Sequence, residues 1–140
     1  MSDECSSTQI TSKKSFRINA KYWALTYPQC SLPNSAALIA LKDIAKERLH
    51  WCLVGEEKHA DGQPHLHAIV ALHTRWNVRN PHHWDLHGYH GNYQAVKSLQ
   101  KWIIYVTKEK NVVSHGADWE QMRAQALKKQ STKDRDWETM

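Results

Sequence analysis

The sequence predicts an α+β fold in which helices pack on an antiparallel sheet. Three observations support this fold: strand-like alternation, helical spacing of apolar residues, and one turn between two strands. The 140 residues suffice for one domain with a substantial core. Strand-like apolar patterns cover 16–27, 50–57 and 64–73, and helical spacing covers 35–48 and 95–108. A turn at 60–62 favours a hairpin between the second and third strands. The order β-α-β-β-(β)-α predicts an α+β sandwich with helices on one face of the sheet.

The first half of the chain alternates clearly between two faces. In the first strand, one face is expected to carry Tyr22, Ala24 and Thr26, and the other Trp23, Leu25 and Tyr27. Pro28 ends this strand, because proline cannot donate to a sheet ladder. The stretch 33–35, Pro-Asn-Ser, is typical of a helix start, and an amphipathic helix is expected over 35–48.

The second half is less regular. Residues 74–86 hold Asn, Pro and His and are expected to be irregular, and 87–93 is expected to be a short strand weakened by two glycines. The stretch 118–130 is helical by composition but poor in apolar residues, and 1–13 is expected to be a loose arm. The expected organisation is therefore an arm over 1–13, a domain over 14–117 and a helical tail over 118–140.

Composition narrows the possible environments. The net charge of +5 and the pI near 9.2 permit a phosphate-bearing partner without requiring one. Seven Trp and five Tyr suit both core packing and base stacking. The three cysteines form no Cys-x-x-Cys pair, which argues against a structural zinc site and a disulfide scaffold. With no signal peptide or long apolar run, we expect an intracellular protein without a membrane partner.

Two histidines share one face of the third strand. His65 and His67 are two residues apart, so they project together while Leu66 points the opposite way. Glu57 ends the preceding strand of the hairpin, and its carboxylate can reach the same ion across a strand spacing of about 4.8 Å. Two imidazoles and one carboxylate predict one divalent site that suits Mn²⁺ or Mg²⁺, with Zn²⁺ as an alternative. The competing interpretation is two strand histidines with ordinary hydrogen-bond partners.

The second helix carries a tyrosine beside lysines. Tyr105 lies between the apolar arc and an arc that holds Lys97, Lys101 and Lys108. Nearby cations stabilise a phenolate and attract phosphate, which suits a tyrosine nucleophile acting on a phosphodiester. The alternative is an ordinary amphipathic helix with a half-buried tyrosine and a solvated lysine face.

Four segments together resemble the rolling-circle replication motifs of geminivirus-type replication initiators, the HUH endonucleases of circular single-stranded DNA viruses. The resemblance covers roughly 14–120, includes 84–86 and 89–98, and rests on FRINAK at 16–21, ALTYPQC at 24–30, EKHADGQPHLH at 57–67 and YVTK at 105–108. It implies a five-stranded antiparallel sheet flanked by helices, akin to an RNA-recognition fold. The departures are Trp23 and Ala24 in place of the usual aromatic-rich start of the first motif, and Trp102 before the third.

The resemblance also implies an activity. Glu57, His65 and His67 would hold the ion, and Tyr105 would cut single-stranded DNA in an origin hairpin loop. The tyrosine would keep the 5′-phosphate and release a 3′-hydroxyl for priming, while Lys108 would steady the phosphate or assist the nucleophile. The implied setting is the host nucleus, with a monomeric isolated domain and an oligomeric full-length protein. No Gly-x-x-x-x-Gly-Lys is present, so this chain would be the nuclease domain without its helicase.

DNA contacts are expected near both ends of the domain, mostly on charged and polar side chains. The segment 16–19 matches the family element tied to repeated double-stranded origin sequences. The candidates are Phe16, Arg17, Asn19, Lys21, Lys97 and Lys101. The His-rich stretch 81–90 is expected to contact bases, hold an adventitious metal or form only a surface loop. The rival functions are a non-catalytic single-strand binding module, a hydrolytic metallonuclease, and an HUH relaxase or transposase.

Overall fold

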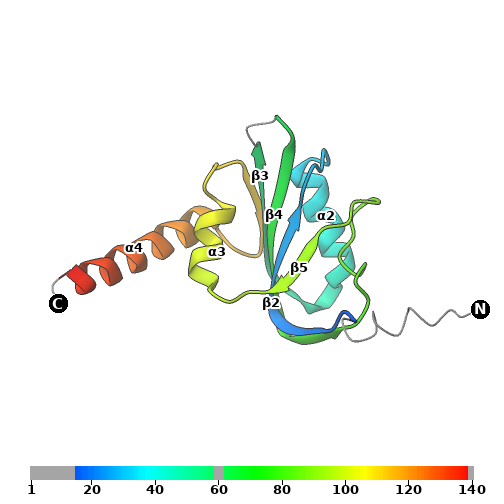
Figure 1. Ribbon diagram of the computed structural model, residues 1–140, viewed down its shortest axis with the longest axis horizontal. Coiled ribbons are helices and arrows are strands. Elements are labelled where there is room, and N and C mark those ends of the chain that lie inside the picture. Colours follow the sequence, from blue (N-terminus) through cyan, green and yellow to red (C-terminus); the bar gives the residue numbers. More distant parts are fainter. Residues whose placement is uncertain (1–14, 59–61, 139–140) are drawn as a thin grey trace, which may run out of the picture.

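A five-stranded antiparallel sheet forms the centre of the described residues, as expected from the family resemblance (Figure 1). The computed structural model describes residues 15–58 and 62–138. The strand order is β5-β2-β4-β3-β6. The strands are β2 (Ile18–Tyr27), β3 (Leu49–Lys58), β4 (Pro64–Val78), β5 (Asn92–Ala95) and β6 (Val112–His115). The helices are α2 (Asn34–Ala45), the 3₁₀ turn η1 (Lys46–Arg48), α3 (Leu99–Val106) and α4 (Trp119–Glu138).

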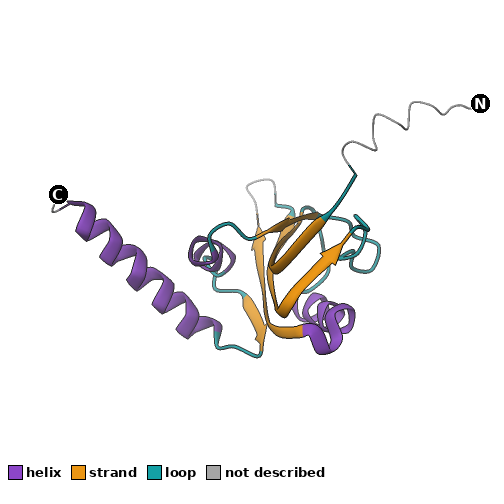
Figure 2. Ribbon diagram, turned by 90° about the horizontal axis from the view of Figure 1, so that it is seen from below, coloured by secondary structure: helices purple, strands orange, loops and turns teal. Residues whose placement is uncertain are grey.

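Helices cover both faces of the sheet, so the expectation of helices on one face is wrong (Figure 2). The physical reason is that the central strand β4 is apolar on both sides. Leu66 and Val70 join the core under α2, while Ile69 and Ala71 join the core under α3 and α4. A strand with two apolar faces needs a cover on each.

The expected alternation of β2 is confirmed. Trp23, Leu25 and Tyr27 are buried in the core under α2. Tyr22 packs at the edge of the opposite core. This alternation places Thr26 beside His67, its partner in the β2–β4 register.

Several boundaries differ from those expected. β4 continues to Val78 because its outer end pairs with the start of β2, so 74–78 is not irregular. The short strand lies at Asn92–Ala95 rather than 87–93, and α3 begins only at Leu99, where the Ser98 side chain accepts a hydrogen bond from the Lys101 N–H. β6 was not expected from the residue pattern.

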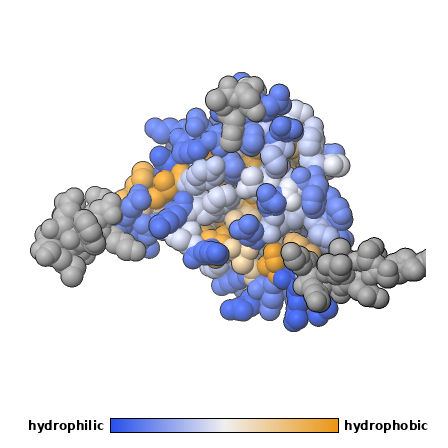
Figure 3. All heavy atoms as spheres, viewed as in Figure 1, coloured by the Kyte–Doolittle hydropathy of each residue, from blue (hydrophilic) through white to orange (hydrophobic). Residues whose placement is uncertain are grey.

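The described part of the chain begins at residue 15 and ends in the long helix α4. The expected arm over 1–13 and most of the turn at 60–62 lie outside the described residues. The helical expectation for 118–130 is confirmed by α4, whose start contacts the core through Trp119, Met122 and Ala126. Figure 3 shows a mostly hydrophilic surface on the face in view, with an apolar patch along α4. None of the helices in the described part of the chain is long and apolar enough to span a membrane.

Candidate active site

The β3–β4 hairpin brings the predicted carboxylate into contact with one of the two predicted histidines and places it opposite the other. Glu57 lies directly opposite His65 in the register, and Gly55 lies opposite His67. Glu57 and His67 are in contact, with 2.8 Å between Oε1 and Nε2. An ionised carboxylate only accepts hydrogen bonds, so the His67 Nε2–H donates. The hairpin register therefore converts a sequence separation of ten residues into a direct contact.

His67 lies in a protected position. Its side chain is 6% exposed, and Nδ1 lies 3.4 Å from the Thr26 hydroxyl. Burial lowers the pKa of His67 below its ordinary value, and the hydrogen bond to Glu57 only partly opposes this effect. The imidazole is therefore neutral near pH 7, the form that binds metal ions.

Helix α3 places Tyr105 against His67. The two rings meet edge to face, with their centroids 4.8 Å apart. Trp102 stacks on Tyr105 at 5.2 Å, and its indole N–H donates to the Ala68 carbonyl at 2.9 Å. The Trp102 side chain thus anchors the tyrosine ring to β4 from one helical turn away.

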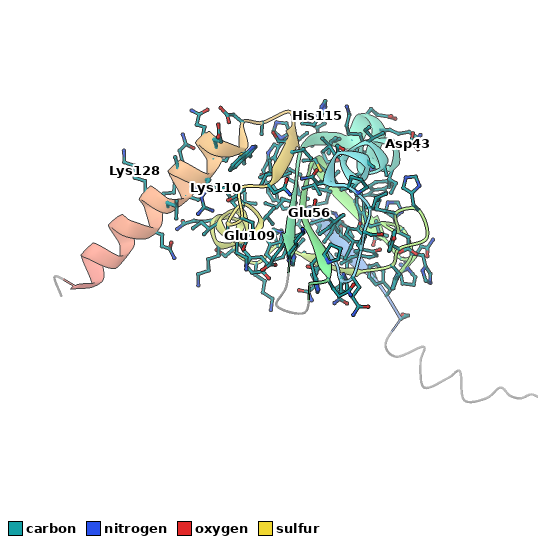
Figure 4. The ribbon with its side chains drawn as sticks, turned by 90° about the horizontal axis from the view of Figure 1, so that it is seen from above. Asp43, Glu56, Glu109, Lys110, His115 and Lys128 are labelled. Atoms are coloured by element: carbon teal, nitrogen blue, oxygen red, sulfur yellow. The ribbon has the colours of Figure 1, made fainter. Side chains whose placement is uncertain are left out.

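The end of α3 comes unusually close to β3. A Cβ on Gly55 would lie 2.1 Å from the Val106 carbonyl oxygen, so only glycine fits under this backbone. Figure 4 labels Glu109 and Lys110 after this helix, and the next residue, Asn111, accepts a hydrogen bond from the Glu56 N–H at 2.9 Å. Gly55 is thus the position that lets the residues after Tyr105 reach the hairpin.

Lys108 joins the tyrosine to the carboxylate. Its ammonium lies 2.6 Å from Glu57 Oε2 and 4.2 Å from the centre of the Tyr105 ring. Partial burial acts to raise the pKa of Glu57, but hydrogen bonds from Lys108 and His67 outweigh it and lower the pKa to about 2. The same hydrogen bond to Glu57 raises the pKa of Lys108. The site is therefore a charged pair beside a neutral histidine.

The donor set fits a divalent ion. Two imidazoles and one carboxylate form a mixed nitrogen and oxygen set of the kind that first-row divalent ions bind. In this structure a cation, the Lys108 ammonium, already lies on Glu57. Glu57, His65 and His67 are the residues predicted to hold the ion, and the Glu57 carboxylate is ionised at neutral pH.

A groove leads to Tyr105 along the β2–β5 edge of the sheet. It has a volume of about 540 Å³ and ends at Trp102 and Tyr105. Its remaining lining comes from β2, β5, the loop before α3 and α3 itself: Ala24, Thr26, Asn92, Gln94, Ala95, Val96, Lys97, Ser98 and Lys101. Two of the predicted DNA-contacting lysines thus lie in the same groove as the tyrosine.

A smaller groove of about 310 Å³ continues from the first one. Both are lined by Ala95 and Val96, and the smaller one adds the predicted Asn19 and Lys21 together with Arg75. The structure therefore gathers four predicted DNA contacts along one surface path.

Phe16 and Arg17 are not among the residues that line either groove. Phe16 packs against the core under α2, and Arg17 is exposed. The structure thus separates these two candidates from the surface path.

Sequence reasoning missed Arg123. The guanidinium, on α4, donates to the Ile104 carbonyl at 3.1 Å and to the Thr107 hydroxyl at 2.9 Å. It therefore ties α4 to the last turn of the helix that carries Tyr105. Nothing in the sequence pattern pointed to this residue, because the contact depends on how two helices meet. From the sequence, Trp102 stands out only as a departure before the third motif, although its spacing three residues before Tyr105 is a usable signal for their stacking contact.

Comparison with known proteins adds an independent observation. A family model described as "Geminivirus Rep catalytic domain" matches residues 16–121. The chain belongs to this family. It is 38% identical over 104 residues to "Replication-associated protein A" of Tobacco yellow dwarf virus (strain Australia), an alignment that covers 74% of this chain and 35% of the relative.

Other relatives agree with this family. "Replication-associated protein" of Miscanthus streak virus (isolate 91) is 38% identical over 93 residues, covering 66% of this chain and 27% of that protein. "Replication-associated protein" of Cabbage leaf curl virus (isolate Jamaica) is 32% identical over 111 residues, covering 74% and 32%. The chain thus spans about a third of the length of these Rep relatives, and the matched region includes Glu57, His65, His67, Tyr105 and Lys108.

Proposed function

We propose that this Rep domain initiates viral rolling-circle replication by nicking and joining single-stranded origin DNA, with Tyr105 as the nucleophile. The observation that carries the proposal is the contact of Tyr105 with His67 at the end of a lysine-lined groove, with Lys108 bridging to Glu57. This arrangement brings together a nucleophile, a predicted metal site and a path for a phosphate backbone. A binding module without catalysis has no need for these groups at one place.

In the proposed reaction, the phenol oxygen of Tyr105 attacks the scissile phosphorus. A bond forms between this oxygen and phosphorus, and the bond to the 3′-oxygen breaks. The phenol proton leaves, and the released 3′-oxygen takes up a proton. The products are a 5′-phosphotyrosine and a free 3′-hydroxyl that can prime synthesis. Attack by a 3′-hydroxyl on the phosphotyrosine reverses the step and joins the ends.

The residues around Tyr105 have separate tasks in this scheme. A divalent ion on Glu57, His65 and His67, for which we propose Mn²⁺ or Mg²⁺, would neutralise charge on the phosphate. Lys108 stabilises the phosphate or the phenolate, because its ammonium already lies over the Tyr105 ring. Trp102 fixes the ring plane through its stacking contact.

The grooves support a single-stranded substrate. Lys97 and Lys101 can neutralise phosphates next to the tyrosine, and Asn19 and Lys21 can do so further along the path. The proposed partner is the loop of an origin hairpin in the host nucleus, with double-stranded origin repeats as a second DNA partner. We also propose that 14–117 is the nuclease domain, monomeric by itself, and that 118–140 leads toward parts of a longer, oligomeric protein.

A denaturing gel tests the proposal. The chain is incubated with an end-labelled single-stranded origin oligonucleotide with Mn²⁺ and with chelator. Tyr105→Phe is compared with Tyr89→Phe, a control tyrosine whose hydroxyl contacts only Ser31 among the hydrogen bonds described. The proposal predicts a covalent protein–DNA band that needs the metal and Tyr105 but not the Tyr89 hydroxyl. Cleavage that survives in Tyr105→Phe without a covalent band would instead indicate a hydrolytic nuclease.

A further inference from the structure

A second group of potential metal ligands lies away from the nuclease site, in the segment between β4 and β5. His82 Nδ1 lies 2.9 Å from Asp85 Oδ2, and His90 Nδ1 lies 2.7 Å from Asp85 Oδ1. One imidazole thus faces each oxygen of a single carboxylate. The three ligand atoms all lie within 4.8 Å of one another.

The backbone holds this cluster together. Leu86 and Tyr89 exchange two backbone hydrogen bonds, of 2.7 and 3.0 Å, around a two-residue turn. Both turn residues have positive φ, 48° at His87 and 86° at Gly88, as a type I′ turn requires. The turn reverses the chain and returns His90 to the side of Asp85. The convergence of the three ligands therefore follows from the fold of the segment.

A buried tyrosine orients the carboxylate. The Tyr93 hydroxyl donates to Asp85 Oδ1 at 2.6 Å and accepts from the Gly91 N–H at 2.9 Å. Asp85 is therefore held in place by an outer hydrogen-bond partner, as metal-binding carboxylates commonly are.

We propose that His82, Asp85 and His90 form a second metal site, selective for Zn²⁺ over Mg²⁺. Two imidazole nitrogens and one carboxylate oxygen suit Zn²⁺, whereas Mg²⁺ prefers oxygen ligands and its own water. Tetrahedral Zn²⁺ places its ligand atoms about 3.4 Å apart. Each imidazole nitrogen, now 2.7 or 2.9 Å from the carboxylate oxygen that it faces, is therefore within about 0.7 Å of the required spacing from that oxygen. The His82 and His90 side chains are 65% and 49% exposed, which leaves access for a water as fourth ligand.

The site has a structural consequence for the nuclease groove. Gly91 follows His90 directly and lies against β2, where an added Cβ would be 2.1 Å from the Thr26 carbonyl oxygen. Asn92 then lines the groove that ends at Tyr105. Zn²⁺ bound to His90 fixes the segment that leads into this wall of the groove.

Calorimetric titration with Zn²⁺ tests the proposal. The full chain carries His65→Ala and His67→Ala, so that the predicted nuclease ligands do not contribute. We expect this chain to bind one Zn²⁺ and to retain it in a large excess of Mg²⁺. Adding His82→Ala and His90→Ala should weaken Zn²⁺ binding about 100-fold or more. Equal Zn²⁺ affinity with and without His82 and His90 would overturn the proposal, as would the absence of Zn²⁺ binding.

The matched control replaces another pair of neighbouring histidines. His50 and His73 stack with their rings 5.0 Å apart. Their replacement by alanine, in the same background, should leave Zn²⁺ affinity unchanged, and an equal loss of Zn²⁺ affinity for both pairs would contradict a specific site.

If the variant that lacks His82 and His90 does not fold, the imidazole ¹⁵N resonances of the unmutated chain test the proposal. Zn²⁺ should shift those of His82 and His90, and shifts confined to other histidines would refute the site. These readouts do not depend on nicking, so they stand or fall separately from the proposed function.

Discussion

Replacing Gly55 by alanine should disable nicking while leaving most DNA binding intact. The added Cβ would lie 2.1 Å from the Val106 carbonyl oxygen and 3.2 Å from Val106 Cγ1. The backbone oxygen cannot rotate away, so the end of α3 must move from β3 by more than about 1 Å to restore ordinary contact. This movement separates Tyr105 and Lys108 from Glu57 and His67. A misplacement of about 1 Å costs about 100-fold in rate, and overpacking costs about 1–3 kcal/mol of stability.

The assay measures the initial rate of cleavage, the binding of single-stranded DNA by fluorescence anisotropy, and the free energy of unfolding in urea. Gly88→Ala is the matched control. Its φ of 86° strains an alanine, but a Cβ there meets nothing within 4 Å, and the residue lies in the turn between β4 and β5 rather than under the end of α3. The control should lose about 1 kcal/mol of stability with little change in cleavage rate. A wild-type rate for Gly55→Ala would refute the idea that the α3–β3 approach aligns the site.

Three further predictions concern charged residues around α3. Lys108→Met should reduce nicking and flatten the pH dependence of unfolding. Because Lys108 helps to lower the pKa of Glu57 from its ordinary 4.5 to about 2, the ionised carboxylate stabilises the fold fully above pH 4.5, and this contribution is lost as the pH falls toward about 2. Urea unfolding at a series of pH values measures the difference, and an unchanged pH profile would contradict the ion pair. Lys97→Gln and Lys101→Gln should each lower the salt slope of single-stranded DNA binding by about 0.7. In anisotropy titrations the control variant Lys128→Gln, on α4 (Figure 4), should leave the salt slope unaltered. Equal salt slopes for all three variants would place the DNA elsewhere. Arg123→Gln should cost about 1–3 kcal/mol in urea unfolding, because the hydrogen bonds that tie α4 to α3 are weakened, and no loss would show that α3 is held without them.

The sequence predicted the features that depend on local periodicity. The predicted hairpin is present, and it places Glu57 opposite His65 in the register and in contact with His67. The alternation of 22–27 correctly assigned the residues of β2 to its two faces. Periodicity also predicted that Tyr105 lies at the rim of the core near lysines, and the structure confirms this position for Lys101 and Lys108.

The features that were missed depend on how elements meet in space. The contact between Arg123 and α3 joins two helices whose crossing has no local pattern. The need for glycine at position 55 arises from the backbone of α3, about fifty residues away along the chain. β6 is short and only partly buried, so it lacks the apolar alternation that identifies a strand. Helix coverage of both sheet faces was missed because the apolar run of β4 was interpreted for its histidines rather than for its two buried faces.

The most direct test of the central claim is the intact mass of the chain after reaction with a single-stranded origin oligonucleotide and Mn²⁺. The expected result is a mass gain equal to the 5′-phosphorylated 3′ fragment less one water, located on Tyr105 by peptide mapping, together with a released fragment that a polymerase can extend. Cleaved DNA without any mass gain, or a nucleotide attached to a different tyrosine, would contradict the account.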